Sequence, residues 1–358
     1  MDEKMINGGG SQPHLGNSKY ITLAGVISAL SVVILHTDGC YWTFSSTARY
    51  WKTANIIDAV FYFAVPVFFM MSASTLLDYN KRYDTKTFFK KRINKTVIPY
   101  IFWSLMIIVF NITVLKALDA SSVTLGYIAN ALGTGSACGY YWFFPSLFSF
   151  YLSIPLFSLI PENKRKSIFI YVSTVSFIVC SVIPFIISVF NFSFSVSLTI
   201  GVGSGYLFYL TTGYLISHYD MDPKVCKIIY VLGIIGLLVH IVGTYFVSMH
   251  AGEIVRTYKG YTNVPGILYS VAIFVFFKQY GNRIMNIKII DRIVNFLSKY
   301  TFSIYLLQFF VIKTFTEILL INRYSIIYRL FGVIPITIII VAVTMVIRKI
   351  PILKKLLP

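Results

Sequence analysis

Hydrophobic residues gather into ten runs along the chain, and short polar or basic stretches separate one run from the next. The runs cover residues 20–37, 56–77, 97–115, 141–160, 168–190, 198–217, 228–248, 264–277, 300–320 and 331–347. Most are close to the ~20 apolar residues that a helix needs to cross the hydrocarbon layer of a bilayer. Because only helices and closed barrels satisfy their backbone hydrogen bonds in lipid, the pattern predicts an all-α polytopic membrane protein with about ten transmembrane helices.

The composition points to the same class of protein. Hydrophobic residues make up 57% of the 358 residues and charged residues only 12%, which excludes an ordinary soluble domain. No polar stretch is long enough for a separate soluble domain, so we expect residues 20–358 to form a single membrane domain. Residues 1–19 are polar and rich in glycine, and we interpret them as a disordered N-terminal tail.

The net charge of +18 arises from basic clusters that lie between the apolar runs. Cytoplasmic loops of membrane proteins carry an excess of Lys and Arg. An orientation with both termini in the cytoplasm places these basic clusters in the cytoplasmic loops. We therefore predict this orientation. Since the spacing of the clusters follows the topology, nucleic acid is not an expected partner.

The first run carries one ionisable side chain, His36, close to its far end. The predicted orientation puts His36 at the outer surface of the membrane, and an ionisable residue within a span is a functional candidate. A neutral imidazole is suited to take a proton from a hydroxyl and return it near neutral pH. Asp38 is a candidate partner only if the helix ends at Thr37, since residues two apart on a helix do not face each other. The alternative is a histidine that only caps the helix.

A basic segment precedes the third run and has the sequence FFKKRINKTVIPY. Lys91 and Lys95 lie four residues apart and are predicted to share a helical face, with Arg92 beside them. Arg binds phosphate through two parallel hydrogen bonds and Lys binds it as a point charge. The cluster is therefore a candidate site for the phosphates of a nucleotide-based donor. The alternative is attraction to anionic lipids, which any basic cluster at the membrane surface provides.

Four further side chains are candidates for an acceptor site or a pore lining. Trp142 begins the fourth run and is suited either to anchor its helix at the membrane interface or to stack on a sugar. Tyr305 and Gln308 lie three residues apart in the ninth run, and we expect both to point into the bundle, because polar groups in lipid need partners. Glu253 lies near Arg256 in a predicted outer loop, where both either bind an acceptor or remain solvated. The four cysteines lack metal-ligand spacing, so we predict no metal site.

The chain resembles the acyltransferase-3 family of integral membrane acyltransferases through an ordered set of motifs. They are SVVILHT in the first run, FAVPVFFMMSAS in the second, FFKKRINKTVIPYIFW leading into the third, YWFFPSLFSFYLSIPLF in the fourth and FLSKYTFSIYLLQFF in the ninth. The set spans nearly the whole chain. Stand-alone members that O-acetylate bacterial surface polysaccharides are the most similar in character.

The resemblance implies an O-acyltransferase of the bacterial cytoplasmic membrane. Acetyl-CoA, or another short acyl-CoA, would be the donor substrate on the cytoplasmic side, with no bound cofactor, and the acceptor would be a cell-surface or lipid-linked glycan. His36 matches the catalytic histidine of the family, and Arg92 and Lys95 match its pair of basic donor-binding residues. Two positions depart from the family pattern: Gly25 replaces an arginine eleven residues before the histidine, and Gln308 replaces a second histidine.

These observations favour an O-acetyltransferase, and they leave open whether His36 is a general base or carries the acyl group as an acyl-imidazole. The departures at Gly25 and Gln308 give some support to a different hypothesis, a non-enzymatic polysaccharide exporter or flippase of related fold. A membrane sensor is the third hypothesis. The lipid bilayer is an expected partner, and assembly into a homo-oligomer is left open.

Overall fold

The computed structural model describes residues 18–192, 205–351 and 353–358 of the chain. Helix accounts for 78% of the structure and the described residues contain no strand, which confirms the all-α prediction. Residues 1–17 of the predicted N-terminal tail, and residues 198–204 of the sixth apolar run, lie outside the described residues.

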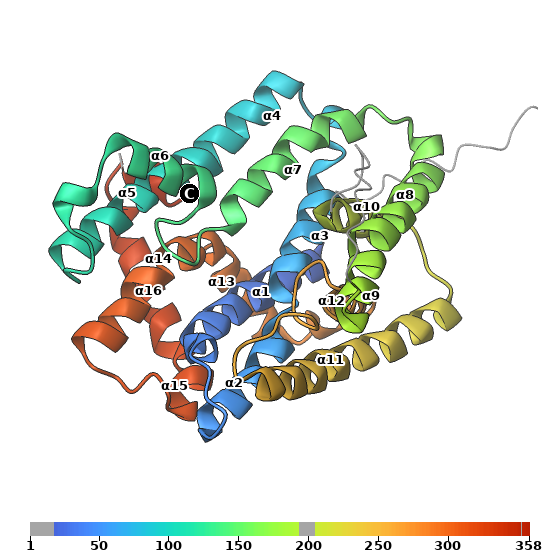
Figure 1. Cartoon of the computed structure of the whole chain (residues 1–358). Coiled ribbons are helices and arrows are strands. Elements are labelled where there is room, and N and C mark those ends of the chain that lie inside the picture. Colours follow the sequence, from blue (N-terminus) through green and yellow to red (C-terminus); the bar gives the residue numbers. More distant parts are fainter. Residues whose placement is uncertain (1–17, 193–204, 352) are drawn as a thin grey trace, which may run out of the picture.

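The helices form one bundle, joined mostly by short connections (Figure 1). The α-helices of the described ranges are, in chain order, α1 (Lys19–Thr37), α2 (Arg49–Phe61), α3 (Ala64–Leu76), α4 (Thr85–Arg92), α5 (Ile98–Thr113), α6 (Leu125–Thr134), α7 (Phe143–Ser158), α8 (Glu162–Phe177), α9 (Ile183–Phe190), α10 (Gly205–His218), α11 (Pro223–Ala251), α12 (Val264–Ile284), α13 (Lys288–Ser298), α14 (Thr301–Lys313), α15 (Ile326–Phe331) and α16 (Val333–Ile347). π-Helical turns extend α4, α8 and α14, namely η4 (Ile93–Val97), η6 (Ile178–Val182) and η7 (Thr314–Ile318). Short 3-10 helices are η2 (Gly39–Trp42), η3 (Tyr79–Lys81), η5 (Ala120–Ser122) and η8 (Leu353–Leu356).

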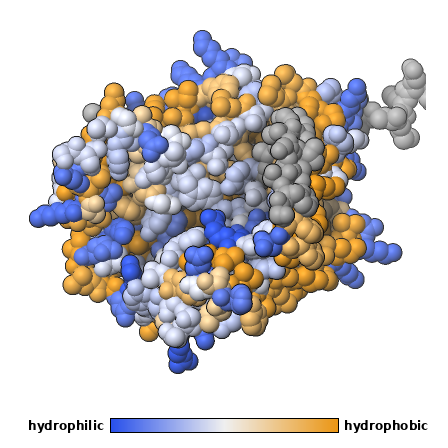
Figure 2. Space-filling model, in the orientation of Figure 1, coloured by the Kyte–Doolittle hydropathy of each residue, from blue (hydrophilic) through white to orange (hydrophobic). Residues whose placement is uncertain are grey.

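The described part of the chain contains six helical stretches that are long and apolar enough to cross a membrane. They are Lys19–Thr37, Arg49–Lys81, Thr85–Thr113, Glu162–Phe190, Pro223–Ala251 and Val264–Ile284. Helices α7 and α16 are apolar but shorter. The chain is therefore a multi-pass membrane protein, while ten spans and the orientation of the termini stay predictions. Hydrophobic residues cover much of the flanks in Figure 2, as expected of a surface in contact with lipid.

Helix α1 packs against α3, α12, α13 and α14 near the middle of the bundle (Figure 1). Most of its apolar side chains are buried, as expected of a helix that is hydrophobic on all sides. The contact with α12 is close, because a Cβ at Gly281 would lie 2.6 Å from the Cβ of Tyr20. At the other end of α1, the Thr37 hydroxyl donates to the Arg329 carbonyl of α15 at 2.8 Å. This contact fixes the end of the helix that carries His36.

Two ion pairs with buried arginines join segments that are far apart in the sequence. Asp38 Oδ1 accepts from Arg329 Nη1 at 3.1 Å, and both side chains are at most 2% exposed. Asp78, just after α3, accepts from Arg165 Nη1 of α8 at 2.5 Å. The first pair connects the end of α1 to α15, and the second connects the end of α3 to α8.

We expect Arg329→Ala to lower the free energy of unfolding by about 3–5 kcal/mol, because it leaves the Asp38 charge buried without a partner. Thermal unfolding of the purified protein in detergent measures the loss. Arg323→Ala removes an exposed arginine from the same region and should change stability by no more than about 0.5 kcal/mol. Equal stabilities of the Arg329 variant and the wild type would show that this ion pair does not hold the helices together.

Candidate active site

His36 lies in the wall of a cavity of about 580 Å³. This volume is within the range of ~300–1,000 Å³ that is usual for small-molecule sites. The wall is contributed by α1, η2, the end of α2, residues 139–142, α10 and the loop after α11. Besides tyrosines, its titratable side chains are those of His36, Asp58 and Arg256, and its aromatic rings are those of Trp42, Tyr62, Tyr140, Trp142, Tyr206 and Tyr261. The cavity thus combines a few polar groups with a mainly aromatic surface.

A chain of hydrogen bonds fixes the tautomer of His36. Gln308 Nε2 donates to the Tyr305 carbonyl at 3.1 Å, which leaves Gln308 Oε1 to accept from His36 Nδ1 at 2.9 Å. Nδ1 therefore carries the proton and Nε2 carries a lone pair. The Tyr140 ring stacks on the imidazole with a centroid distance of 3.7 Å and an interplanar angle of 9°. No group in the described part of the chain bonds Nε2, so the basic nitrogen of an oriented ring is left for a ligand.

Asp38 does not hold the imidazole. Helix α1 ends at Thr37, as that pairing would require, but the Asp38 carboxylate is bonded to Arg329. The hydrogen-bond partner of His36 is Gln308 instead. Sequence reasoning missed both contacts because the partners are 272 residues apart in the His36 pair and 291 residues apart in the Asp38 pair.

Of the other predicted acceptor residues, one lines the cavity and three do not. Trp142 lines it together with His36. Tyr305 is buried, and its hydroxyl donates to the Tyr140 carbonyl at 2.6 Å. Tyr305 and Gln308 are both buried, as expected. Glu253 is exposed in the loop after α11 and is not among the residues that line the cavity.

Asp58 and Lys259 form a buried ion pair at the cavity wall. The Lys259 side chain is 0% exposed, and its ammonium lies 4.3 Å from the ring centres of both Tyr41 and Tyr62. Burial lowers the pKa of the Lys259 ammonium, and the neighbouring Asp58 carboxylate acts in the opposite direction. Sequence reasoning missed this pair, although a carboxylate within the apolar run 56–77 was a signal for a functional or paired group.

The basic residues predicted to bind the donor lie around the junction of α4 and η4. The Arg92 guanidinium lies 5.8 Å from the ring centre of Phe88 and 5.7 Å from that of Tyr151. Its Nε atom is buried and has no hydrogen-bond partner in the part of the chain that the structure describes. Because buried donors are normally satisfied, this atom is a candidate contact for a bound ligand.

The π-helical turn η4 alters the spacing on which the predicted shared face of Lys91 and Lys95 depends. A π-helix forms hydrogen bonds over five residues instead of four. The Lys91 ammonium lies 3.7 Å from the Tyr83 ring centre, whereas Lys95 lies in η4 and is exposed. Such turns are frequent at functional sites, and this one begins directly after Arg92.

A smaller cavity of about 160 Å³ lies between the Arg92 region and the histidine site. Tyr151, whose ring contacts Arg92, lines it. Tyr305 also lines it, and the Tyr305 hydroxyl bonds the backbone of Tyr140, whose ring stacks on His36. No described residue lines both cavities. Tyr305 and Tyr140 therefore form part of the partition between them.

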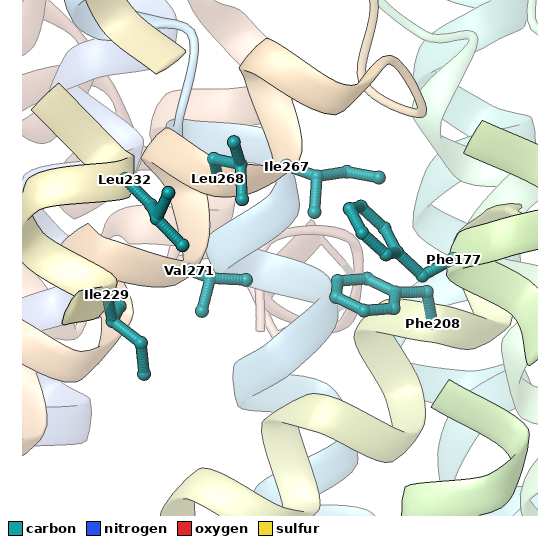
Figure 3. Close-up of a pocket in the computed structure, with 7 residues that line it drawn as sticks. All are labelled: Phe177, Phe208, Ile229, Leu232, Ile267, Leu268 and Val271. Carbon is teal, nitrogen blue, oxygen red and sulfur yellow. The ribbon is translucent and has the colours of Figure 1, made fainter. Parts of the chain in front are cut away.

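A third cavity, of about 120 Å³, lies between α8, α10, α11 and α12 (Figure 3). The rings of Phe177 and Phe208 lie next to each other and face the aliphatic side chains of α11 and α12. The whole lining is apolar and consists of Phe177, Phe208, Ile229, Leu232, Ile267, Leu268 and Val271. A wall of this kind offers no group that takes or gives a proton, so we place the candidate chemistry at His36.

The bundle and its aromatic, histidine-containing cavity define a polytopic membrane protein with a site large enough for a small ligand. The family model described as "Acyltransferase domain" matches residues 18–348 of the chain. The chain therefore belongs to the acyltransferase-3 family, as its motifs predict, and it is a membrane acyltransferase. No curated protein and no solved structure matches it.

Proposed function

We propose that the protein is an O-acyltransferase, in the simplest case an O-acetyltransferase, of the bacterial cytoplasmic membrane. Its donor would be acetyl-CoA or another short acyl-CoA, and its acceptor a hydroxyl of a cell-surface or lipid-linked glycan. The observation that carries the proposal is His36 Nε2, an unprotonated nitrogen that no described residue bonds, at the wall of a cavity of about 580 Å³. A general base needs this combination of a fixed tautomer, a free lone pair and room for the hydroxyl.

The phosphates of the donor would bind at Arg92, with Lys91 and Lys95 adding positive charge. Support comes from the buried Nε of Arg92, since leaving a buried donor unsatisfied costs about 1–3 kcal/mol. A phosphate oxygen would satisfy this donor through a charge-assisted hydrogen bond. The exposed ammonium groups of the two lysines would contribute mainly through their charge.

The thioester arm would pass from Arg92 through the cavity of about 160 Å³ toward His36. The last barrier on this path is the contact between Tyr305 and the Tyr140 backbone. One such hydrogen bond contributes only about 0.5–1.5 kcal/mol. Passage of the thioester would also require the Tyr305 ring to leave its contacts with Phe143 and Phe144.

Two routes of transfer stay open at His36. In the first, Nε2 removes the proton of the acceptor hydroxyl, the oxygen attacks the thioester carbonyl, the C–S bond breaks, and the proton passes to the departing thiolate. In the second, Nε2 attacks the thioester and the thiolate leaves, after which the acceptor oxygen attacks the acyl-imidazole and its proton passes to the thiolate. Both routes yield one ester and one CoA, and in both Gln308 Oε1 holds the Nδ1 proton.

Release of CoA separates this proposal from its rival, a non-enzymatic exporter or flippase of related fold. Purified protein is incubated with acetyl-CoA labelled in the acetyl group and with a glycan acceptor, and labelled ester and free CoA are both measured. The proposal expects the two products in equal amounts. Movement or binding of the glycan without release of CoA would support the exporter instead.

We expect Gln308→Leu to lower kcat about 5- to 10-fold with little change in KM for the acyl-CoA. Leucine has a similar volume but cannot accept the hydrogen bond from His36 Nδ1, so the imidazole loses a hydrogen bond worth about 1 kcal/mol. Steady-state kinetics measure both constants. Gln279→Leu removes an exposed glutamine of α12 and should leave both unchanged. A wild-type kcat for the Gln308 variant would mean that this amide does not position the imidazole.

A further inference from the structure

We propose that the cavity beside His36 selects an acceptor glycan that carries a negative charge, and that the Arg256 guanidinium binds that charge. This inference rests on the proposed function, because it names the class of acceptor for the same site. The charge would be a carboxylate of a sugar acid or a phosphate linked to the sugar. Both present oxygen pairs that match the fork of a guanidinium.

Arg256 is an exposed, positively charged group of the cavity wall that has no counter-ion among the described residues. The acid of the wall, Asp58, is already paired with the buried Lys259. The Arg256 guanidinium lies 5.6 Å from the Trp42 ring centre and makes no ion pair within the described ranges. Glu253, three residues earlier, is exposed and does not pair with it. With a neutral imidazole the wall therefore keeps one uncompensated positive charge, which an anionic acceptor would balance.

The loop that carries Arg256 is held in place by its own backbone contacts. The Arg256 carbonyl accepts from the Lys259 backbone N–H at 3.1 Å and from Asn263 Nδ2 at 3.1 Å. Lys259 in turn is anchored to Asp58 of α2. The fixed element is the Arg256 backbone, from which the exposed side chain reaches the cavity wall.

Aromatic rings near Arg256 form a wall suited to a sugar ring. The Tyr261 ring stacks on Tyr62 with a centroid distance of 4.1 Å and on Trp142 with a centroid distance of 5.1 Å. Such rings combine an apolar face with a polar edge, as a sugar ring does. A charged sugar would find an apolar surface, an unpaired cation and the His36 imidazole in one cavity.

The experiment measures binding to the full-length protein in detergent, without a donor. The probes are a disaccharide containing glucuronic acid, the methyl ester of the same disaccharide, and a matching disaccharide phosphate. Binding is followed by tryptophan fluorescence, since Trp42 and Trp142 line the cavity. The variants are Arg256→Gln, Arg256→Lys and, as a matched control, Arg49→Gln, which removes an exposed arginine outside the cavity.

We expect the wild type and Arg49→Gln to bind at least one of the two anionic probes about 10- to 100-fold more tightly than the ester. Arg256→Gln should lose this preference, and Arg256→Lys should keep part of it, because the charge remains but the fork is lost. The affinities for the carboxylate and phosphate probes show which anion the site binds. Equal binding of charged and uncharged probes, binding of none of them, or an unchanged preference in Arg256→Gln would overturn the inference.

Failure of this inference and failure of the proposed function give different results. The binding measurement needs no acyl-CoA, whereas the proposed function is judged by CoA release and ester formation. Acylation of neutral and charged glycans alike would support the proposed function and contradict the role of Arg256. Binding of the anionic probe without release of CoA would support the Arg256 site and contradict the proposed acyltransferase mechanism.

Discussion

Replacement of His36 by alanine should lower the rate of acyl transfer about 100- to 10,000-fold, the range that a positioned acid or base contributes. The imidazole is the group that would take the acceptor proton or carry the acyl group, and the described cavity wall offers no second imidazole. Binding of acyl-CoA should stay within about twofold of the wild type, because Arg92 lies on the other side of the smaller cavity. Transfer of labelled acetyl to glycan and equilibrium binding of acyl-CoA measure the two effects.

A matched histidine variant controls for unspecific damage. His250→Ala removes an exposed histidine at the end of α11, and we expect it to keep wild-type activity. His36→Asn keeps a polar side chain in the cavity, so its loss of activity cannot come from an empty space alone. If either His36 variant transfers acetyl at the wild-type rate, the imidazole takes no part in the chemistry.

The second large effect is expected at Arg92, where alanine should raise KM for acyl-CoA about 10- to 100-fold while kcat changes less. This is the range for loss of a hydrogen bond to a charged group, and a change in KM alone is the result of losing binding that ground state and transition state share. The KM of Arg92→Lys should lie between those of the wild type and Arg92→Ala, because lysine keeps the charge but not the planar fork of the guanidinium. Steady-state kinetics with varied acyl-CoA give the constants.

Lys90→Ala is the matched control for the Arg92 variant. Lys90 is exposed in the same helix and its removal changes the net charge by the same amount. We expect its KM to stay close to the wild type. Equal rises of KM in both variants would mean that the segment acts through its overall charge, as in attraction to anionic lipids.

The helical class and the family could be predicted from the sequence because both depend on local patterns. Each apolar run lies on one or more helices of the structure, apart from the residues of the sixth run outside the described ranges. Helices α4, α6 and α13 lie outside the ten runs because they are short, and in α4 and α13 polar residues also interrupt the apolar positions. Gly25, where the family usually has an arginine, lies against α3, since a Cβ there would be 3.0 Å from Met71 Cε.

The candidate site could be predicted only in part, because its contacts join distant segments. His36, Trp142 and Arg92 stand out by position or motif, whereas the bond from His36 to Gln308 depends on how α1 packs against α14. From the sequence, Glu253 and Arg256 receive the same prediction, because both are charged residues of one loop. The structure separates them, with Arg256 at the cavity wall and Glu253 outside it.

Transfer across a sealed membrane is the most direct test of the central claim, that a thioester bound at Arg92 is used by an imidazole in a separate cavity. Protein of known orientation is reconstituted in liposomes, labelled acetyl-CoA is added on the Arg92 side, and glycan is enclosed on the His36 side. The account predicts labelled glycan inside the liposomes with the wild type and none with His36→Ala. Label that appears only on glycan placed on the same side as acetyl-CoA would contradict it.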